Sequence, residues 1–354
     1  MEIEKSKPLS LLIFIPLLFL VFIRPFFSGL AYPAFEFYYE IFIIFLLIVL
    51  IISRRGGLNL PYGYVLPILL FLAAYITSTI FSVNIHNSIK ETIKFISYFS
   101  IFFMVSVLDS GQKKILIKII VFAAAIIGVY SIYQYFWGYQ HTIDYLKKIN
   151  SDFLRSSSYA RDILIHKRAI GTFPSPNILG GYLILIFFLA LGQRRGGVTP
   201  PLQIFPVIIV IFALLLTKSL GAWLSLIITL IVFFALFYRS IKHKRAVLIF
   251  SLIAAIAVIC FIFAARGERL TNLENPQSSI AQRLDYWRTA INIIKDHPVL
   301  GVGPGNFQEV FLKYKVGLST DTRYAHNIFL HTWSEAGIIG FIAILSLIIA
   351  FLTK

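Results

Sequence analysis

Apolar runs recur along this chain at the length that a helix needs to cross a membrane. A hydrocarbon core is about 30 Å thick, which a helix crosses in about 20 apolar residues. Hydrophobic residues make up 58% of the 354 residues and charged residues only 14%. Because backbone groups in lipid must be hydrogen-bonded within their own segment, each run is expected to be a helix. The sequence therefore predicts an all-α, polytopic transmembrane bundle.

About ten runs qualify as spans. They are Leu9–Ile23, Phe35–Ile52, Tyr64–Phe81, Thr92–Leu108, Ile115–Phe136, Asn177–Gly192, Leu202–Leu216, Leu220–Tyr238, Ala246–Ala265 and Ala336–Leu352. The first resembles a signal peptide, but no small-residue cleavage site follows it, so a retained helix is expected. We expect a bundle in residues 1–265, with a smaller outer loop at 138–176. A large helical, extracytoplasmic catalytic loop is expected at 266–335, and the final span in 336–354.

The positions of lysine and arginine predict the orientation, because short cytoplasmic loops are enriched in both. With the N-terminus inside, the inside loops hold Lys5, Lys7, Arg54, Arg55, Lys113, Lys114, Arg194, Arg195, Arg239, Lys242, Lys244 and Arg245. The short outside loops hold only Arg24, Lys90, Lys94 and Lys218. Both ends of the chain are therefore expected in the cytoplasm, and both long loops outside.

The net charge of +16 does not indicate nucleic-acid binding, because much of the excess lies in the orienting loops. The two outer loops are also basic, which suits an anionic ligand or is simply a solvated surface. Cys260 is the one cysteine, so no intrachain disulfide can form and cysteine usage does not indicate the redox compartment.

Residues 279–296 have the spacing of an amphipathic helix that Pro298 ends. The helix is expected to lie on the membrane or against the mouth of the bundle. Arg288 faces an anionic ligand or pairs with Asp285, three residues before it. The apolar stripe is Leu284, Trp287, Ile291 and Ile294, and the basic face is Arg288, Asn292 and Lys295.

Glycines and histidines follow this helix. Gly301, Gly303 and Gly305 are expected to form a tight turn before Asn306. The amides at the start of the next helix could hold a phosphate, or the turn has no binding role. His326, at the join to the last span, is suited to accept a proton or is structural. His331 lies five residues further, which does not fit a zinc pair.

Three further polar positions lie at outer ends of spans. Arg168 precedes the sequence GTFPSPN at residues 171–177, where Asn177 can cap the next helix. Its guanidinium can hold a phosphate bidentately. Lys218 lies in TKSLGAW at residues 217–223, and Glu335 is a second acid or base candidate directly before the last span.

These motifs together resemble the O-antigen ligase and Wzy-type polymerase superfamily. The matching patterns are GTFPSPN, TKSLGAW, RLDYWR, DHPVLGVGPGNF, AHNIFL and EAGIIG, in this order between Arg168 and Gly340. The resemblance implies transfer of a glycan from undecaprenyl diphosphate to an acceptor hydroxyl outside the bacterial inner membrane. The acceptor is lipid A core for a ligase and another glycan for a polymerase. No cofactor, metal or nucleic acid is implied.

By this resemblance His326 is the expected general base, and Arg168, Arg283, Arg288 and Lys218 are expected to hold the diphosphate. Asn177, Asn327 and Glu335 are secondary candidates. Leu220 departs from the family, which commonly has arginine there, and the chain is expected to be short at its C-terminus. The alternatives are a polymerase, a protein O-oligosaccharyltransferase, a lipid-linked glycan transporter, and an inactive or structural protein.

Overall fold

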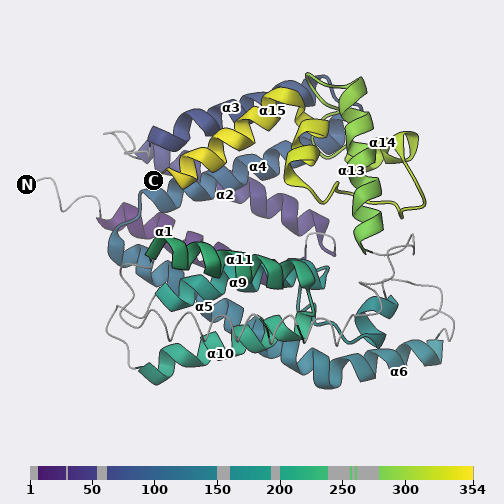
Figure 1. The fold of residues 1–354 in the computed structure, drawn as a ribbon. Coiled ribbons are helices and arrows are strands. Elements are labelled where there is room, and N and C mark those ends of the chain that lie inside the picture. The colour runs from purple at the N-terminus through teal and green to yellow at the C-terminus, as the bar shows by residue number, and fades with distance from the viewer. Residues whose placement is uncertain are drawn as a thin grey trace, which may run out of the picture. The chain divides into compact units, whose positions relative to one another are not determined.

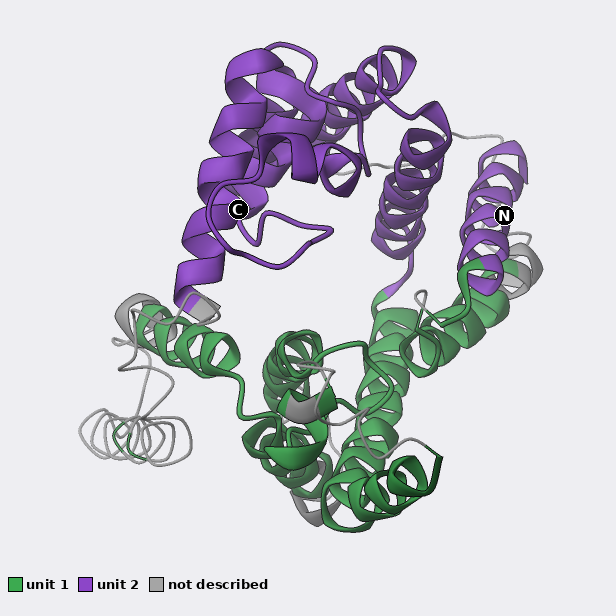
Figure 2. Cartoon of the chain, turned by 90° about the vertical axis from the view of Figure 1, so that its right-hand side faces the viewer, with its two compact units in different colours: residues 1–33, 110–267 green, residues 34–109, 268–354 purple. Residues whose placement is uncertain are grey.

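The computed structural model describes residues 7–28, 31–53, 62–149, 160–192, 200–237 and 279–353, with the single positions 256 and 260. Over these residues every regular element is a helix and no strand occurs, which confirms the all-α prediction (Figure 1). The chain divides into two compact units (Figure 2). Unit 1 is residues 1–33 with 110–267, and unit 2 is residues 34–109 with 268–354.

Unit 1 is built around α5, which packs against α1, α9 and α10. Gly128 of α5 lies so near α10 that a Cβ atom there would be 2.5 Å from the Ile209 side chain. Small residues let helices approach closely in this way. The elements of unit 1 are α1 (Lys7–Ile23), η1 (Arg24–Phe26), α5 (Ser110–Tyr133), η2 (Gln134–Gly138), α6 (Tyr139–Ile149), η3 (Arg161–Ile165), α9 (Pro176–Gly192), α10 (Pro200–Thr217) and α11 (Leu220–Phe237).

In unit 2 the last helix packs along α3 and against α13. Its core includes a ring cluster in which the centroids of Phe71 and Tyr75 are 4.3 Å apart and those of Phe71 and Phe95 are 5.1 Å apart. The elements of unit 2 are α2 (Pro33–Ser53), α3 (Tyr62–Ile80), α4 (Ile85–Ser106), α13 (Ser279–Asp296), α14 (Phe307–Tyr314) and α15 (Ile328–Leu352).

Four described helical segments are long and apolar enough to cross a membrane: Pro33–Ser53, Tyr62–Ile80, Ser110–Ile149 and Ile328–Leu352. Four shorter apolar helices accompany them, at Ile13–Phe26, Pro176–Gly192, Ile204–Thr217 and Leu220–Val232. The predicted span Ala246–Ala265 lies outside the described residues except for positions 256 and 260. The number of about ten spans and the orientation stay predictions.

Two predicted boundaries differ from the structure. The last helix begins at Ile328 rather than Ala336, because Asn327 caps it and residues 328–335 already have helical spacing. The expected outer loop 138–176 is partly helical, since it contains α6 and the π-helix η3.

A break in α15 lies against the segment that links α13 to α14 in unit 2. Gly337 has φ 68° and ψ −170°, values outside the helical region. A turn formed by residues 298–303 lies against this break and takes over the lost hydrogen bonds. The amides of Val302 and Gly303 donate to the carbonyls of Ser334 and Glu335, at 3.0 and 2.9 Å, and Ile338 donates to the Pro298 carbonyl at 3.0 Å.

The glycines of this turn are thus needed for close approach. A Cβ atom on Gly301 would lie 2.4 Å from the carbonyl carbon of Glu335, and one on Gly337 would lie 1.8 Å from the Val299 carbonyl oxygen. Glycine at both positions also has a positive φ, 70° and 68°, which other residues adopt only with strain.

We predict that Gly337→Ala lowers the thermal unfolding temperature of the purified protein. The new Cβ atom would collide with Val299 and strain the backbone, together costing at least about 2 kcal/mol. Gly181→Ala in α9 is the matched control, because a Cβ atom there meets nothing within 4 Å and alanine favours a helix. Equal unfolding temperatures for the two variants would contradict the proposed role of the break.

Candidate functional site

In unit 1, Arg168 lies at the centre of a polar cluster. It is 5% exposed. Its Nε donates to the Thr217 carbonyl at 3.2 Å, its Nη2 donates to Asn177 Oδ1 at 3.3 Å, and its Nη1 forms an ion pair with Asp162. The Tyr139 hydroxyl donates to the Arg168 carbonyl at 2.5 Å. The side chain therefore joins η3 to the start of α9 and the end of α10.

Asn177 does not cap α9 as the sequence suggested. Ser175 Oγ instead accepts from the Ile178 amide at 3.3 Å. The Asn177 carbonyl oxygen accepts from Arg168 and from Ser219 Oγ, the latter at 2.8 Å. The prediction of a cap was wrong because two residues distant in sequence compete for the same oxygen.

Two lysines of this cluster have unusual backbone conformations. Lys167 has φ 45° and Lys218 has φ 48°, in the left-handed region that non-glycine residues rarely occupy. Lys218 Nζ donates to the His166 carbonyl at 2.9 Å and lies 5.4 Å from the centroid of the Tyr135 ring. Such outliers gather at functional sites and support a hypothesis of function.

The charges of the cluster differ in availability. Asp162 neutralises Arg168, whereas Lys167 is exposed and Lys218 is half-buried. Lys167 and Asp162 were not among the site residues expected from sequence. Lys167 stands next to Arg168 in the chain, but nothing in the spacing indicates that Asp162 pairs with it. Leu220, in place of the family arginine, is half-buried at the first position of α11.

In unit 2, His326 stands between two structural residues. Ala325 is fully buried in an apolar cluster with Tyr286 and Phe311. Asn327 caps α15, with its Oδ1 accepting from the amides of Phe329 and Leu330 at 3.0 and 3.3 Å. His326 itself has φ 52° and is exposed. Its ring centroid lies 5.6 Å from that of Tyr286.

The surroundings of His326 favour its neutral form. The protein that partly surrounds the ring has the largest effect and lowers the His326 pKa below its ordinary value of 6.5. The positive charges of Arg283 and His331 lower this pKa further. The lowered pKa favours the neutral imidazole, which has a free nitrogen that can accept a proton.

Helix α13 has the predicted bounds, Ser279–Asp296, but buries another face than expected. Tyr286, Ala290 and Ile293 pack into the apolar cluster of unit 2. Leu284 and Ile291 of the predicted apolar stripe are 43% and 42% exposed. Trp287 and Ile294, the other two residues of the stripe, are half-buried, so only part of the stripe turns away from the core of unit 2.

Both arginines of α13 are exposed. Arg288 Nη1 lies 3.6 Å from Asp285 Oδ1, which confirms the pairing that the sequence left open. The Arg288 side chain is nevertheless 66% exposed, and exposed pairs of this kind are weak. The charge of Arg283 lowers the pKa of His326, so the two side chains lie within electrostatic range of each other. Within unit 2 the structure therefore brings Arg283 to the candidate base.

Glu335 is enclosed rather than open to a substrate. It is 2% exposed, and its Oε1 accepts from the Phe307 amide at the start of α14, at 3.0 Å. Its Oε2 lies 3.5 Å from His331 Nε2. Asn306 does not cap α14 with its side chain, which donates to Ser88 Oγ at 2.9 Å. The Phe307 amide, one of the helix-start amides considered above for binding a phosphate, therefore donates to the carboxylate of Glu335 instead.

We predict that a ¹⁵N-histidine NMR titration of the full-length protein places the His326 pKa below 6.5, with His326→Gln used for assignment. Arg283→Gln removes a nearby positive charge and should raise this pKa. Arg288→Gln is the control, since Arg288 is not among the groups that act on His326. A His326 pKa at or above 6.5, or equal effects of both variants, would contradict the described environment.

The same shift links His326 to stability. Because its pKa is lower in the folded protein, the unfolded chain takes up a proton first as the pH falls through 6.5. The contribution of His326 to folding stability is therefore present above pH 6.5 and decreases as the pH falls toward the folded-state pKa.

Comparison with known proteins yields a family match. Residues 205–345 match the family model described as O-antigen ligase. An uncharacterized protein of Haemophilus influenzae is 26% identical over 163 residues, covering 40% of this chain and 40% of its own length. The chain thus spans well under half of the relative that it matches. Lys218, Arg283, Arg288, His326, Asn327 and Glu335 lie inside the family match, and Arg168 and Asn177 lie before it.

Proposed function

We propose that this chain, whose residues 205–345 belong to the O-antigen ligase family, is a membrane glycosyltransferase. It moves a glycan from an undecaprenyl-diphosphate carrier to an acceptor hydroxyl on the outer face of the bacterial inner membrane. The observation that carries this proposal is His326, which is exposed and in a rare backbone conformation, and whose pKa is lowered by partial burial and by the charge of Arg283. Both ends of the chain are cytoplasmic in this proposal.

The reaction needs a base and a site for a departing anion. The acceptor oxygen attacks the anomeric carbon of the donor, and the bond from that carbon to the diphosphate oxygen breaks. His326 takes the hydroxyl proton, a role worth about 10²–10⁴-fold in rate. Undecaprenyl diphosphate leaves with its electron pair and negative charge. Fixed cations stabilise this charge in the transition state.

In unit 2, Arg283 and Arg288 are exposed on α13 and are the proposed cations. In unit 1, the proposed cation is Lys218. Arg168 was expected to contact the diphosphate directly. Its buried guanidinium is bonded to Asp162, Asn177 and Thr217, so we propose that it positions Lys167 and Lys218. Glu335 and Asn327 support the site through α14 and α15.

The acceptor determines the class of enzyme. Lipid A core would make the protein a ligase, another glycan a polymerase, and a protein side chain an O-oligosaccharyltransferase. We propose lipid A core as the acceptor. A lipid-linked glycan transporter is the non-enzymatic alternative, and it requires no base on the outer face.

Expression in a ligase-null and in a polymerase-null host tests the proposed class. We predict core-linked glycan ladders on lipopolysaccharide gels in the ligase-null host alone. Restored chain length in the polymerase-null host alone would instead identify a polymerase. Transport of the lipid-linked glycan without any transfer would reject the enzyme.

His326→Ala should reduce the rate of transfer at least about 100-fold, because the base is lost. His141→Ala is the matched control, since His141 is an exposed histidine on α6. Both variants should reach the membrane at wild-type levels, measured by immunoblot. Undiminished transfer by His326→Ala would show that another group accepts the proton.

The two cations of unit 1 are predicted to differ. Lys218→Gln should raise the KM for the lipid-linked donor with little change in thermal stability. Arg168→Lys keeps the charge but loses the planar fork that reaches three partners, so it should lower the unfolding temperature as well as activity. A stable Arg168→Lys protein with only a raised KM would favour direct contact with diphosphate.

A further inference from the structure

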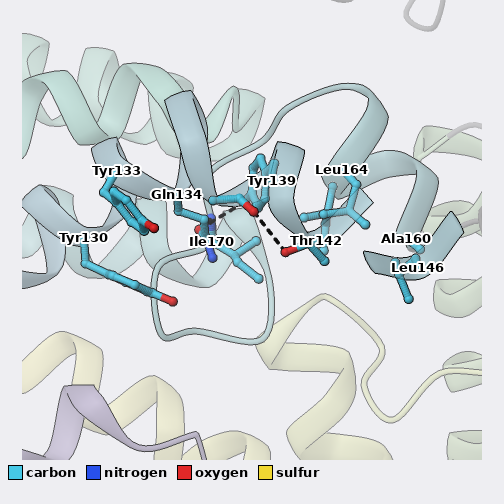
Figure 3. A pocket seen from close by; sticks show the side chains of 11 residues that line it. Tyr130, Tyr133, Gln134, Tyr139, Thr142, Leu146, Ala160, Leu164 and Ile170 are labelled. Atoms are coloured by element: carbon cyan, nitrogen blue, oxygen red, sulfur yellow. Dashed lines mark hydrogen bonds between the residues drawn. The ribbon is translucent and has the colours of Figure 1, made fainter. Parts of the chain in front are cut away.

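A cavity of about 350 Å³ opens in unit 1 where α5 ends (Figure 3). This volume falls within the range of roughly 300–1,000 Å³ that is usual for small-molecule sites. It is bordered by the last turn of α5, by η2 and α6, and by the segment 160–170. All of these elements belong to one unit. None of the residues discussed so far as a base or a cation lines it.

The lining of the cavity is aromatic and aliphatic, with polar groups at a few points. Among the described residues that line it there is no lysine, arginine, histidine, aspartate or glutamate, so this part of the wall does not suit the diphosphate. Charged ligands would lose their hydration there without a partner. The lining residues are Tyr130, Tyr133, Gln134, Gly138, Tyr139, Thr142, Leu146, Ala160, Ile163, Leu164 and Ile170. The cavity therefore suits a neutral molecule or a neutral part of a larger one.

Two π-helical turns, η2 and η3, contribute residues to this lining. Such turns are rare and often occur at functional sites. Gln134, at the start of η2, is held firmly. Its Oε1 accepts from the Gly171 amide at 2.9 Å and from the Tyr139 hydroxyl at 3.1 Å. The wall is thus built before any ligand binds.

Tyr130 and Tyr133 stand partly exposed on this wall, and the Tyr133 ring also stacks on Trp137, with centroids 6.2 Å apart. The two tyrosines are 45% and 49% exposed. Their ring centroids are 6.4 Å apart and their planes differ by 29°, and Figure 3 shows the two side by side at one edge of the cavity. An aromatic face carries negative charge. It attracts the weakly positive C–H face of a pyranose ring, while the phenol groups can bond to the hydroxyls at the sugar's rim.

The cavity also shares a wall with the basic cluster of unit 1. Tyr139 lines the cavity and donates to the Arg168 carbonyl at 2.5 Å. Gln134 lines it and binds the Gly171 backbone. Tyr135, the next residue, lies under the ammonium of Lys218. The cavity is therefore adjacent to the basic cluster of unit 1, where we expect part of the donor's negative charge to bind.

We propose that this cavity is a subsite for a neutral sugar ring of the lipid-linked glycan, stacked on Tyr130 and Tyr133. The inference rests on the proposed function for the source of the sugar. A polyprenyl chain needs only apolar walls, and it could form no hydrogen bond with the phenol groups of the two tyrosines. Aromatic residues also gather at membrane surfaces as anchors, which calls for a control outside the cavity.

Saturation-transfer NMR on the full-length protein in nanodiscs tests the proposal, with methyl glycosides of glucose, galactose, rhamnose and N-acetylglucosamine as probes. At least one glycoside should bind through its ring protons. Tyr133→Ala should weaken this binding roughly three- to tenfold, the effect of one aromatic stacking contact. Tyr133→Trp should retain it. Tyr145→Ala is the matched control, because Tyr145 is 63% exposed on α6 and does not line the cavity.

Farnesol serves as the isoprenoid probe in the same assay. Binding of farnesol but of no glycoside, with loss in Tyr133→Ala, would overturn the proposal in favour of a lipid chain. Equal losses in Tyr133→Ala and Tyr145→Ala would overturn it in favour of membrane anchoring. Unfolding temperatures of all variants should match, and Tyr133→Leu, which removes the aromatic ring but keeps an apolar side chain, serves as a milder variant if Tyr133→Ala is unstable.

Transfer kinetics separate this inference from the proposed function. If both hold, Tyr133→Ala raises the KM for the lipid-linked donor and leaves kcat nearly unchanged, as expected for lost ground-state binding. Wild-type transfer that depends on His326, together with an unchanged KM in Tyr133→Ala, would reject only the subsite. Absence of any transfer would reject the proposed function, while the glycoside titration would still report on the cavity.

Discussion

A helix cannot be broken inside a membrane protein unless its freed backbone groups find other partners. In α15 the break at Gly337 is compensated by the turn 298–303, which donates two amides to the helix and accepts one. This exchange fixes the C-terminal end of α13 and the start of α14 against the last helix. It also fixes the position of α15, the helix that the segment carrying His326 leads into. The candidate base therefore depends on a close backbone contact that only glycine permits at Gly301 and Gly337.

The polar cluster of unit 1 follows from a second constraint, the cost of burying a charge. A guanidinium as enclosed as that of Arg168 needs a counter-charge and hydrogen-bond acceptors. Asp162, Asn177 and the Thr217 carbonyl supply them from three segments of the chain. Lys167 directly precedes Arg168, and Lys218 directly follows Thr217, whose carbonyl accepts from Arg168. Both lysines adopt positive φ values at these points. A buried arginine thus holds two more accessible lysines in place.

Structural features that depend on neighbouring residues in the chain, such as the end of α13, were predicted correctly from the sequence. The bounds of α13 were correct because proline stops a helix regardless of tertiary contacts. Most predicted spans agree with described helices within a few residues.

What was missed depends on partners distant in the chain. The buried face of α13 is chosen by α14 and Ala325, so Tyr286 turns inward and Leu284 does not. Asn177 does not cap α9 because its side-chain oxygen accepts a hydrogen bond from Ser219. The carboxylate of Glu335 accepts one from the amide of Phe307, 28 residues earlier in the chain. The cavity beside Tyr133 has no sequence signal, because it arises where the end of α5, η2 and α6 meet the segment 160–170, which contains η3.

The position of Arg283 near His326 serves two needs of the proposed reaction. In the free protein its charge lowers the His326 pKa, which keeps the imidazole unprotonated. A base with a low pKa is ready to accept a proton but binds it weakly. If Arg283 holds the diphosphate as proposed, the anion offsets its charge and raises the His326 pKa. The histidine would then become a stronger base as the donor arrives, so proton uptake would be coupled to the presence of the leaving group.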